Sequence, residues 1–223
     1  MKTIDTFSFK EKRALIRVDY NVPLDESFMI KDDTRITESL STIKKILSDG
    51  GSVVLISHLG RPKNGPENKF SLKHLVSHLE ILTGVKVLFS DDCVSKKAIN
   101  ISKKMEIGTI HLLENLRFYP EETTGNNDFA EKLSEHGEIY VNDAFGTAHR
   151  SHASTAVIAR YFTDKCFGYL MTKEICNASM LLKNPKKPFT AIVGGAKVSD
   201  KILIIQNLLN IADHIIIGGG MTY

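Results

Sequence analysis

The alternation of apolar and polar segments along the chain predicts strands that are separated by helices. Short apolar runs rich in β-branched residues, each followed by small, polar or glycine residues, are typical of buried parallel strands. The first part of the chain has five such runs, at 14–18, 53–56, 85–89, 110–113 and 139–141. Because parallel strands need helical crossovers, we expect an α/β fold with a doubly wound parallel sheet, a Rossmann-like three-layer sandwich.

Apolar residues between these runs recur at the three- and four-residue spacing of helices. The pattern predicts helices over 34–48, 72–82, 91–105 and 129–136. Asp32 or Asp33 precedes the first helix, Ser71 the second, and Asn126 or Asn127 the fourth. Short polar side chains accept hydrogen bonds from the first amides of a helix, so we expect these residues to act as N-caps.

A new segment begins after a helix predicted at 172–183, which Asn184 and Pro185 end. Two further apolar runs, at 191–193 and 215–217, lead into glycines, and a helix is predicted to begin near Val198. We therefore divide the chain into three parts. They are a first domain over 1–171, a helix and linker over 172–187, and the start of a second, similar α/β domain over 188–223.

Composition narrows the class of protein. Hydrophobic residues make up 42% and charged residues 25% of the 223 positions, as in ordinary globular proteins. The net charge of +3 comes from scattered lysines and arginines, which argues against a nucleic-acid partner. The three cysteines form no CxxC pair, and neither a signal peptide nor an apolar stretch of about 18 residues is recognisable. We expect a cytoplasmic protein with no membrane partner.

Polar side chains follow the predicted strands at their carboxyl ends. His58 and Arg61 lie in the loop directly after the run at 53–56. Ligands of open α/β sheets bind outside the carboxyl ends of the strands, so both side chains are placed to meet an anion; a solvated loop with incidental charges is the alternative. Similar loops bring the set to Asp19, Asn21, Arg35, His58, Arg61, Arg117, His149 and Arg150. Four arginines at one edge would repel one another without a multiply charged anion, such as a small metabolite with phosphate and carboxylate groups.

Several polar positions allow two interpretations. Asp19 and Asn21 are separated by one residue, so they either form a plain Asx turn or hydrogen-bond to ligand hydroxyls. Arg35 lies in the first turn of a predicted helix, where the helix dipole disfavours a cation, and this favours a functional role. His74 and His78 have the four-residue spacing of metal ligands without a third ligand nearby, so we prefer an exposed helical face and predict no metal site.

The glycine-rich segment at 194–201 has the physical properties of a nucleotide site. Glycines let the backbone approach phosphates, and helix N-terminal amides together with Lys197 and Lys201 supply positive charge. The segment fits neither GxGxxG nor GxxxxGK[ST], which excludes the Rossmann dehydrogenase and P-loop classes. A nucleotide phosphate remains the expected ligand.

Seven motifs resemble those of the phosphoglycerate kinase family, in the same order and with the same spacing. They are RVDYNVP (17–23), DDTRI (32–36), SHLGRP (57–62), LLENLRF (112–118), VNDAFGTAHRSHAST (141–155), GGAKVSDKI (194–202) and IIIGGG (215–220). The resemblance implies that 3-phosphoglycerate or 1,3-bisphosphoglycerate is bound by Asp19, Asn21, Arg35, His58, Arg61, Arg117 and Arg150. It also implies that ATP or ADP is contacted by Gly195, Lys197, Lys201 and Gly219.

The family transfers a phosphoryl group reversibly between magnesium-bound ATP and the carboxylate of 3-phosphoglycerate in glycolysis. The resemblance implies that Arg35 and Lys197 stabilise the transferring group while two lobes close over the cleft. Because chains of the family are much longer, we expect a monomeric fragment that lacks the magnesium ligand, binds substrate weakly and is inactive alone. A non-catalytic anion-binding α/β module is the alternative, followed by a nucleic-acid binder.

Overall fold

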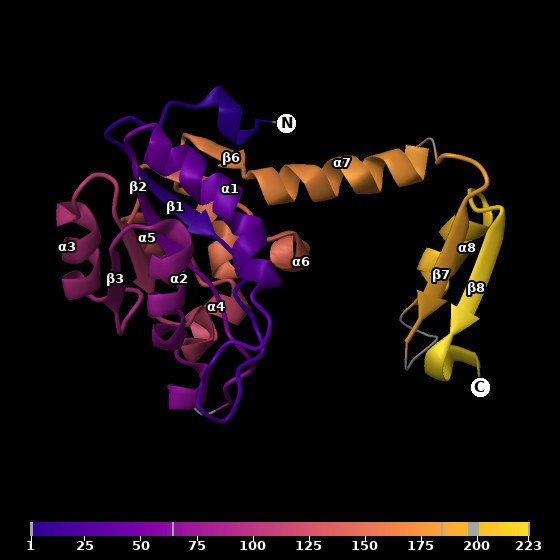
Figure 1. Cartoon of the computed structure of the whole chain (residues 1–223), viewed down its shortest axis with the longest axis horizontal. Coiled ribbons are helices and arrows are strands. Elements are labelled where there is room, and N and C mark those ends of the chain that lie inside the picture. The colour runs from indigo at the N-terminus through magenta and orange to yellow at the C-terminus, as the bar shows by residue number, and fades with distance from the viewer. Residues whose placement is uncertain (1, 64, 184, 196–200, 223) are drawn as a thin grey trace. The chain divides into compact units, whose positions relative to one another are not determined.

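The computed structural model describes residues 2–63, 65–183, 185–195 and 201–222 (Figure 1). They form two compact units, Met1–Lys173 (unit 1) and Glu174–Tyr223 (unit 2). The strands are β1 (Arg13–Arg17), β2 (Ser52–Ile56), β3 (Val87–Ser90), β4 (Ile110–Leu113), β5 (Ile139–Asn142), β6 (Lys165–Phe167), β7 (Thr190–Gly194) and β8 (His214–Gly218).

The described helices are of three kinds. The α-helices are α1 (Thr34–Ser48), α2 (Val76–Thr83), α3 (Lys96–Lys104), α4 (Pro120–Thr124), α5 (Asn127–Ser134), α6 (Phe145–Ala148), α7 (Tyr169–Lys183) and α8 (Ile202–Leu209). The 3-10 helices are η1 (Ile4–Thr6), η2 (Asn68–Phe70), η3 (Leu72–Leu75), η4 (Leu116–Phe118), η6 (Ile158–Arg160) and η8 (Gly219–Thr222). A π-helical segment, η5 (Ala153–Val157), precedes η6.

Unit 1 is built on a six-stranded sheet with the strand order β3-β4-β2-β1-β5-β6. Neighbouring strands are parallel throughout, and β1 pairs with β2 on one side and β5 on the other. On one side of β1 lie β2, then β4, then β3 at the edge, and on the other side lie the later strands β5 and β6. This is the doubly wound arrangement, so the expected fold class is confirmed.

The sixth strand corrects the expectation of five. Strand β6 lies at the edge of the sheet, where Cys166 is opposite Val141 of β5. It has only three residues, and its burial pattern runs from exposed through buried to half-buried. So short a segment at an edge cannot show the run of apolar residues by which a buried parallel strand is recognised.

Helices cover both faces of the sheet (Figure 1). Ala14 and Ile16 of β1 belong to a core that includes the buried side chains of α1 and α2, among them Ile43. Leu15, between them, belongs to a second core that includes Phe129 of α5. Because side chains alternate between the faces of a strand, the apolar runs supply both cores at once.

The helix boundaries agree with the predicted ranges to different degrees, and capping side chains account for several of the starts. Helix α1 has the predicted range, and Oδ1 of Asp32 accepts from the amide of Thr34 at 2.9 Å, whereas Asp33 makes no such bond. Asn126 caps α5. Ser95 caps α3, which therefore begins later than predicted. The helix expected over 72–82 begins as η3 and continues as α2.

Unit 2 contains a two-stranded sheet, β7–β8, in which Gly194 is opposite Gly218. Helix α8 begins at Ile202 and has Lys201 as its N-cap, whereas the start expected near Val198 lies outside the described residues. Across the described parts of both units, no helix combines the length and the apolar character needed to cross a membrane.

Candidate functional site

The predicted site residues of unit 1 all lie at or near the carboxyl ends of neighbouring strands. Those that follow β1 are Asp19, Asn21 and, in the first turn of α1, Arg35; those that follow β2 are His58 and Arg61; Arg117 is in η4 after β4, and Arg150 follows α6 after β5. Since β4, β2, β1 and β5 are consecutive in the sheet, their loops meet at one edge. The structure thus brings together residues that are far apart in the sequence.

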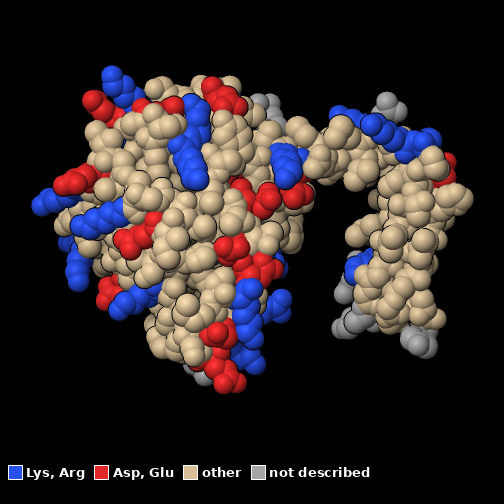
Figure 2. Space-filling view, in the orientation of Figure 1, with Lys and Arg blue, Asp and Glu red and all other residues tan. Residues whose placement is uncertain are grey.

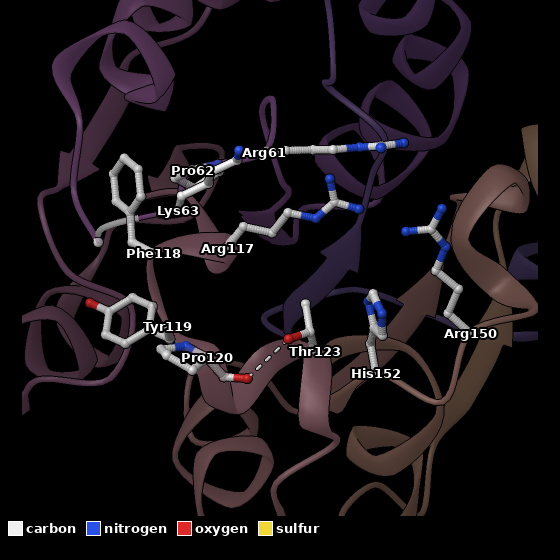
Figure 3. Close-up of a pocket in the computed structure, with 11 residues that line it drawn as sticks. Arg61, Pro62, Lys63, Arg117, Phe118, Tyr119, Pro120, Thr123, Arg150 and His152 are labelled. Atoms are coloured by element: carbon white, nitrogen blue, oxygen red, sulfur yellow. Dashed lines mark hydrogen bonds between the residues drawn. The ribbon is translucent and has the colours of Figure 1, made fainter.

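Three of the predicted arginines line one pocket of about 480 Å³. Figure 3 shows Arg61, Arg117 and Arg150 around the same open space as the ring of His152. Lys63 also lines the pocket, and none of its described lining residues is acidic. Guanidinium groups from three separate loops suit an anion with several oxygen atoms, because each can donate two parallel hydrogen bonds.

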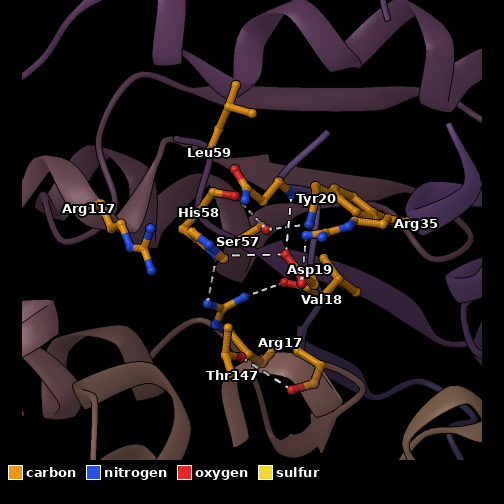
Figure 4. A network of polar contacts seen from close by, with 12 residues as sticks. Arg17, Val18, Asp19, Tyr20, Arg35, Ser57, His58, Leu59, Arg117 and Thr147 are labelled. Carbon is orange, nitrogen blue, oxygen red and sulfur yellow. Dashed lines mark hydrogen bonds and ion pairs between the residues drawn. The ribbon is translucent and has the colours of Figure 1, made fainter. Parts of the chain in front are cut away.

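A buried arginine that the sequence analysis did not select lies beneath this cluster. Arg17, at the end of β1, is 1% exposed. Its Nη2 donates to Nδ1 of His58 at 3.3 Å, and its Nη1 donates to the carbonyl of Val18 (Figure 4). Its Nε donates to Oγ of Ser154 at 2.9 Å. Burial, and then the nearby arginines led by Arg17 and Arg117, lower the pKa of His58 to about 2. His58 is therefore neutral, and the positive charge of the site belongs to the arginines and Lys63.

Asp19 and Asn21 form the turn that the sequence allowed as one of two interpretations. Oδ1 of Asp19 accepts from the amide of Asn21 at 3.3 Å. Oδ2 of the same carboxylate pairs with Nη1 of Arg35 at 3.0 Å (Figure 4). This ion pair explains how the first turn of α1 accommodates a cation despite the helix dipole. The Arg35 side chain is still 51% exposed, so it remains accessible to a ligand.

The loop after β2 is clamped at Gly60. Oδ1 of Asn21 accepts from its amide at 2.8 Å, and Nη1 of Arg117 donates to its carbonyl at 2.7 Å. Its φ of +62° suits glycine, and a β-carbon here would collide with the ring of Phe70. Buried Asn115 holds the preceding residue by donating to the Leu59 carbonyl at 2.7 Å. The clamp fixes Asn21 and Arg117 relative to each other.

Two other residues near the pocket were also missed by sequence reasoning. His152 lines the pocket, whereas His149, which the sequence analysis grouped with the arginines, is exposed and lies outside its described lining. Glu122 of α4 is buried, and its carboxylate accepts from the amide and the hydroxyl of Ser154. Arg17 could have been noticed, because it is the charged residue in the otherwise apolar run at 14–18. Glu122 could not, because its partner Ser154 lies 32 positions away in the sequence.

In unit 2 the predicted nucleotide residues gather at the carboxyl ends of β7 and β8. Nζ of Lys201 donates to the carbonyl of Gly194 at 2.6 Å. Gly219 has φ +71°, and a β-carbon on it would lie 3.3 Å from the amide nitrogen of Gly195. The close approach of these glycines leaves backbone amides near the end of the sheet. Lys197 lies outside the described residues.

The two helical histidines with metal-ligand spacing have other partners. Nε2 of His78 lies 2.9 Å from Oδ2 of Asp33, and Nε2 of His74 lies 2.8 Å from the carbonyl of Asn68. The His74 ring also stacks on Phe28. Within the described ranges no three His, Cys, Asp or Glu side chains come together as a metal site.

Comparison with known proteins gives this site a family context. The family model described as "Phosphoglycerate kinase" matches residues 4–223. The phosphoglycerate kinase of Porphyromonas gingivalis is 49% identical over an alignment that covers 99% of this chain and 59% of that protein. The enzyme of Chlorobium limicola is 47% identical, with 100% and 56% covered. The chain thus spans somewhat more than half the length of the curated relatives it matches.

Solved structures agree with the family match. Phosphoglycerate kinase from Coxiella burnetii is 39% identical with a TM-score of 0.84, and the match covers 98% of this chain and 55% of that chain. The Pyrococcus horikoshii phosphoglycerate kinase is 32% identical with a TM-score of 0.89, at the same coverages. On the family model and the relatives together, the chain belongs to the phosphoglycerate kinase family.

Proposed function

We propose that the chain provides the 3-phosphoglycerate site of a phosphoglycerate kinase, which catalyses 1,3-bisphosphoglycerate + ADP = 3-phosphoglycerate + ATP. The observation that carries the proposal is the pocket lined by Arg61, Arg117, Arg150 and His152, with no acidic side chain in its described lining. A pocket of this kind needs a multiply charged anion to offset the repulsion among its arginines. Membership of the family selects phosphoglycerate among such anions.

The proposed roles follow the positions of the side chains. Arg61, Arg117 and Arg150 bind the phosphate, because their guanidinium groups line the same pocket. Asp19 and Asn21, at the end of β1, hydrogen-bond to the rest of the substrate, and neutral His58 adds a donor without adding charge. Arg35, 51% exposed, and Lys197 stabilise the transferring phosphoryl group, whose charge is spread over its oxygens.

Gly195, Lys201 and Gly219 are proposed to contact ATP or ADP. The paired glycine ends of β7 and β8 support this role, because a backbone without side chains can approach phosphates closely. Magnesium would neutralise the nucleotide phosphates. The residues described in the structure gather no group of three metal-ligating side chains, so we assign no magnesium ligand to this chain.

Three finer statements belong to the same proposal. The chain spans 59% and 56% of two relatives that carry the kinase name, and we propose that alone it binds 3-phosphoglycerate weakly without turnover. The domain ranges 1–171, 172–187 and 188–223 are likewise proposals. Cytoplasmic location and a monomeric state stay predictions.

Calorimetric titration of the chain with 3-phosphoglycerate, at low and high salt, tests the binding. Saturable binding that exceeds the binding of sulfate and is lost in Arg150→Ala would support the proposal. Equal binding of sulfate and 3-phosphoglycerate would favour the alternative, a non-catalytic anion-binding module. ATP-dependent phosphorylation of 3-phosphoglycerate by the purified chain would contradict the proposed inactivity.

A further inference from the structure

A chain of buried hydrogen bonds runs from Glu122 to His58, and chemistry fixes the direction of each bond. The guanidinium of Arg17 can only donate, so Oγ of Ser154 accepts from its Nε at 2.9 Å. The carboxylate of Glu122 accepts, so the Ser154 hydroxyl donates to its Oε1 at 2.6 Å. Glu122, Ser154 and Arg17 are each no more than 1% exposed. Water therefore does not compete for these bonds.

The hydrogen bond between Arg17 and His58 determines which ring nitrogen of His58 carries the proton. Nη2 of Arg17 lies 3.3 Å from Nδ1 of His58, and an arginine nitrogen can approach this atom only if Nδ1 is the unprotonated acceptor. In the other tautomer, Nδ1 would carry the proton and donate it to Oδ1 of Asp19. The distance between Nδ1 and this oxygen is 3.9 Å, which is too long for a hydrogen bond. A neutral ring with Nδ1 unprotonated carries its proton on Nε2.

We propose that Glu122 is a positioning residue of the anion site: through the Ser154 hydroxyl it holds Arg17, and Arg17 holds His58 as the tautomer with its proton on Nε2. His58 then offers a hydrogen-bond donor at every pH at which the protein is folded. A protonated ring would add a further cation to the arginines, whereas the neutral Nε2 tautomer donates without doing so. The tautomer itself is independent of the ligand; its use in binding rests on the proposed function.

The backbone of Ser154 is also hydrogen-bonded, so the position of its hydroxyl relative to Arg17 is fixed. Its amide donates to Oε2 of Glu122 at 2.9 Å, and its carbonyl accepts from the hydroxyl of Tyr140 at 2.8 Å. The same Glu122 carboxylate lies 3.7 Å from Nδ1 of His152, which lines the pocket. The same buried carboxylate thus holds Ser154 by hydrogen bonds and lies near a second histidine of the pocket.

Nitrogen-15 NMR of the imidazole rings, without ligand, tests the proposed tautomer. The His58 signals are identified by their absence in His58→Gln. In the wild-type chain Nδ1 should resonate as an unprotonated and Nε2 as a protonated nitrogen, without titration between pH 5 and pH 8. The charged groups near the ring are Arg17 on β1, Asp19 after β1, Arg35 on α1, Arg117 in η4 and Arg150 after α6. A proton on Nδ1 would overturn the inference.

Ser154→Ala tests the connection, because it removes the hydroxyl and leaves the backbone bond to Glu122. We expect the two His58 nitrogen signals to move toward the average of a mixed-tautomer ring, and the same change in Glu122→Gln. Ser151→Ala and Glu121→Gln, at exposed positions nearby, are the matched controls. Ser154→Thr, which keeps a hydroxyl, should restore the wild-type signals if the variant is folded by circular dichroism. Unchanged His58 signals in folded Ser154→Ala and Glu122→Gln would overturn the connection.

Calorimetric titration of the same variants with 3-phosphoglycerate tests whether the Nε2 tautomer of His58 contributes to binding. Ser154→Ala should weaken binding by about tenfold, the lower end of the loss seen when a residue that supports a metal ligand is removed. If the wild-type chain binds no 3-phosphoglycerate, the proposed function fails and the inference is judged on the tautomer alone. If Ser154→Ala changes the tautomer but leaves the affinity at the wild-type value, the positioning role is wrong.

Discussion

Units 1 and 2 are both parallel α/β structures, but they differ in how their apolar side chains are buried. All five residues of β2 in unit 1 are buried. In unit 2, Ile192 of β7 is 77% exposed and Ile216 of β8 is 52% exposed, and α8 has no buried residue. Most of the atoms visible on unit 2 in Figure 2 belong to uncharged residues. The same sequence pattern of apolar runs thus gives a closed core in one unit and exposed apolar surface in the described part of the other.

The difference shows what makes a strand stable. The central strands of unit 1 have a neighbour on both sides and helices over both faces, so their side chains lose most contact with water. Strands β7 and β8 have each other as the neighbours described in the structure, and a two-stranded sheet is marginally stable by itself. The comparison predicts that the two units respond differently to the same perturbation.

Amide hydrogen exchange should show the largest difference between the two units. Amides of β1, β2 and β5 should exchange only when unit 1 unfolds globally, whereas those of β7 and β8 should exchange through local opening. We expect the free energies of opening to differ by about 4 kcal/mol or more, since a folded domain is stable by roughly 5–15 kcal/mol. Mass spectrometry of peptic fragments measures this difference. Equal protection in the two sheets would contradict it.

A pair of matched substitutions sharpens the contrast. Leu55→Ala, at a fully buried position in β2, should destabilise unit 1 by about 3 kcal/mol because it leaves a cavity. Ile216→Ala, in β8, should cost less than about 1 kcal/mol because half of the side chain is already in water. Urea titration followed by the NMR signals of each unit measures both. Similar losses would show that unit 2 has a core like that of unit 1.

A buried pair of imidazoles makes unit 1 sensitive to acid. Oγ of Ser102 lies 2.8 Å from Nδ1 of His111 and 2.6 Å from Nδ1 of His136. Burial lowers the pKa of each ring to about 4 from 6.5, so the unfolded chain binds protons more readily. The free energy of unfolding is therefore not reduced by these rings above pH 6.5, and it decreases as the pH falls from 6.5 toward 4, because only the unfolded chain takes up protons there.

Between pH 7 and pH 5 the loss of unfolding free energy should be about 2 kcal/mol for each of the two rings. Urea unfolding of unit 1 at both values measures it. His111→Gln should reduce the pH dependence, because it removes one of the two buried rings. A stability that does not change between pH 7 and pH 5 would contradict the neutral, buried state of both rings. Among the described residues unit 2 has no such network.

The smallest expected effect concerns ligand binding and rests on the proposed function. Arg117→Ala should weaken 3-phosphoglycerate binding about tenfold, or about 1.4 kcal/mol, because Arg117 lines the pocket and also holds Gly60. Lys201→Ala in unit 2 is the matched control and should leave this affinity unchanged. Calorimetry measures both. Equal weakening in the two variants would mean that unit 2 contributes to this affinity.

Much of unit 1 could be predicted from the sequence because local signals agree with the fold there. Helix α1 has its predicted range since its apolar stripe, Asp32 and the following glycines all indicate the same boundaries. Strand β6 and the irregular helical segments from α6 to η6 could not be predicted. They are too short for a periodic pattern, and contacts with distant residues decide their conformation.

The candidate site likewise contains residues that the sequence could predict and residues that it could not. Arg61, Arg117 and Arg150 could be found because they follow strands, and topology alone brings strand ends together. Arg17 and Glu122 could not be assigned a role, because that role depends on Ser154, which is 137 and 32 positions away from them. Sequence patterns identify residues that face a ligand more readily than residues that support them.

The position of β1 between β2 and β5 has a consequence for synthesis on the ribosome. Arg17 and Ser154 are 137 positions apart, so at about 10 residues per second the second partner is made on the order of 10 seconds after the first. During that time β1 has only β2 as a neighbour, and Arg17 has no buried partner for its Nε. The candidate anion site therefore cannot assemble before Ser154 has been made, and anion binding by a nascent chain would report that β5 has joined β1 in the sheet.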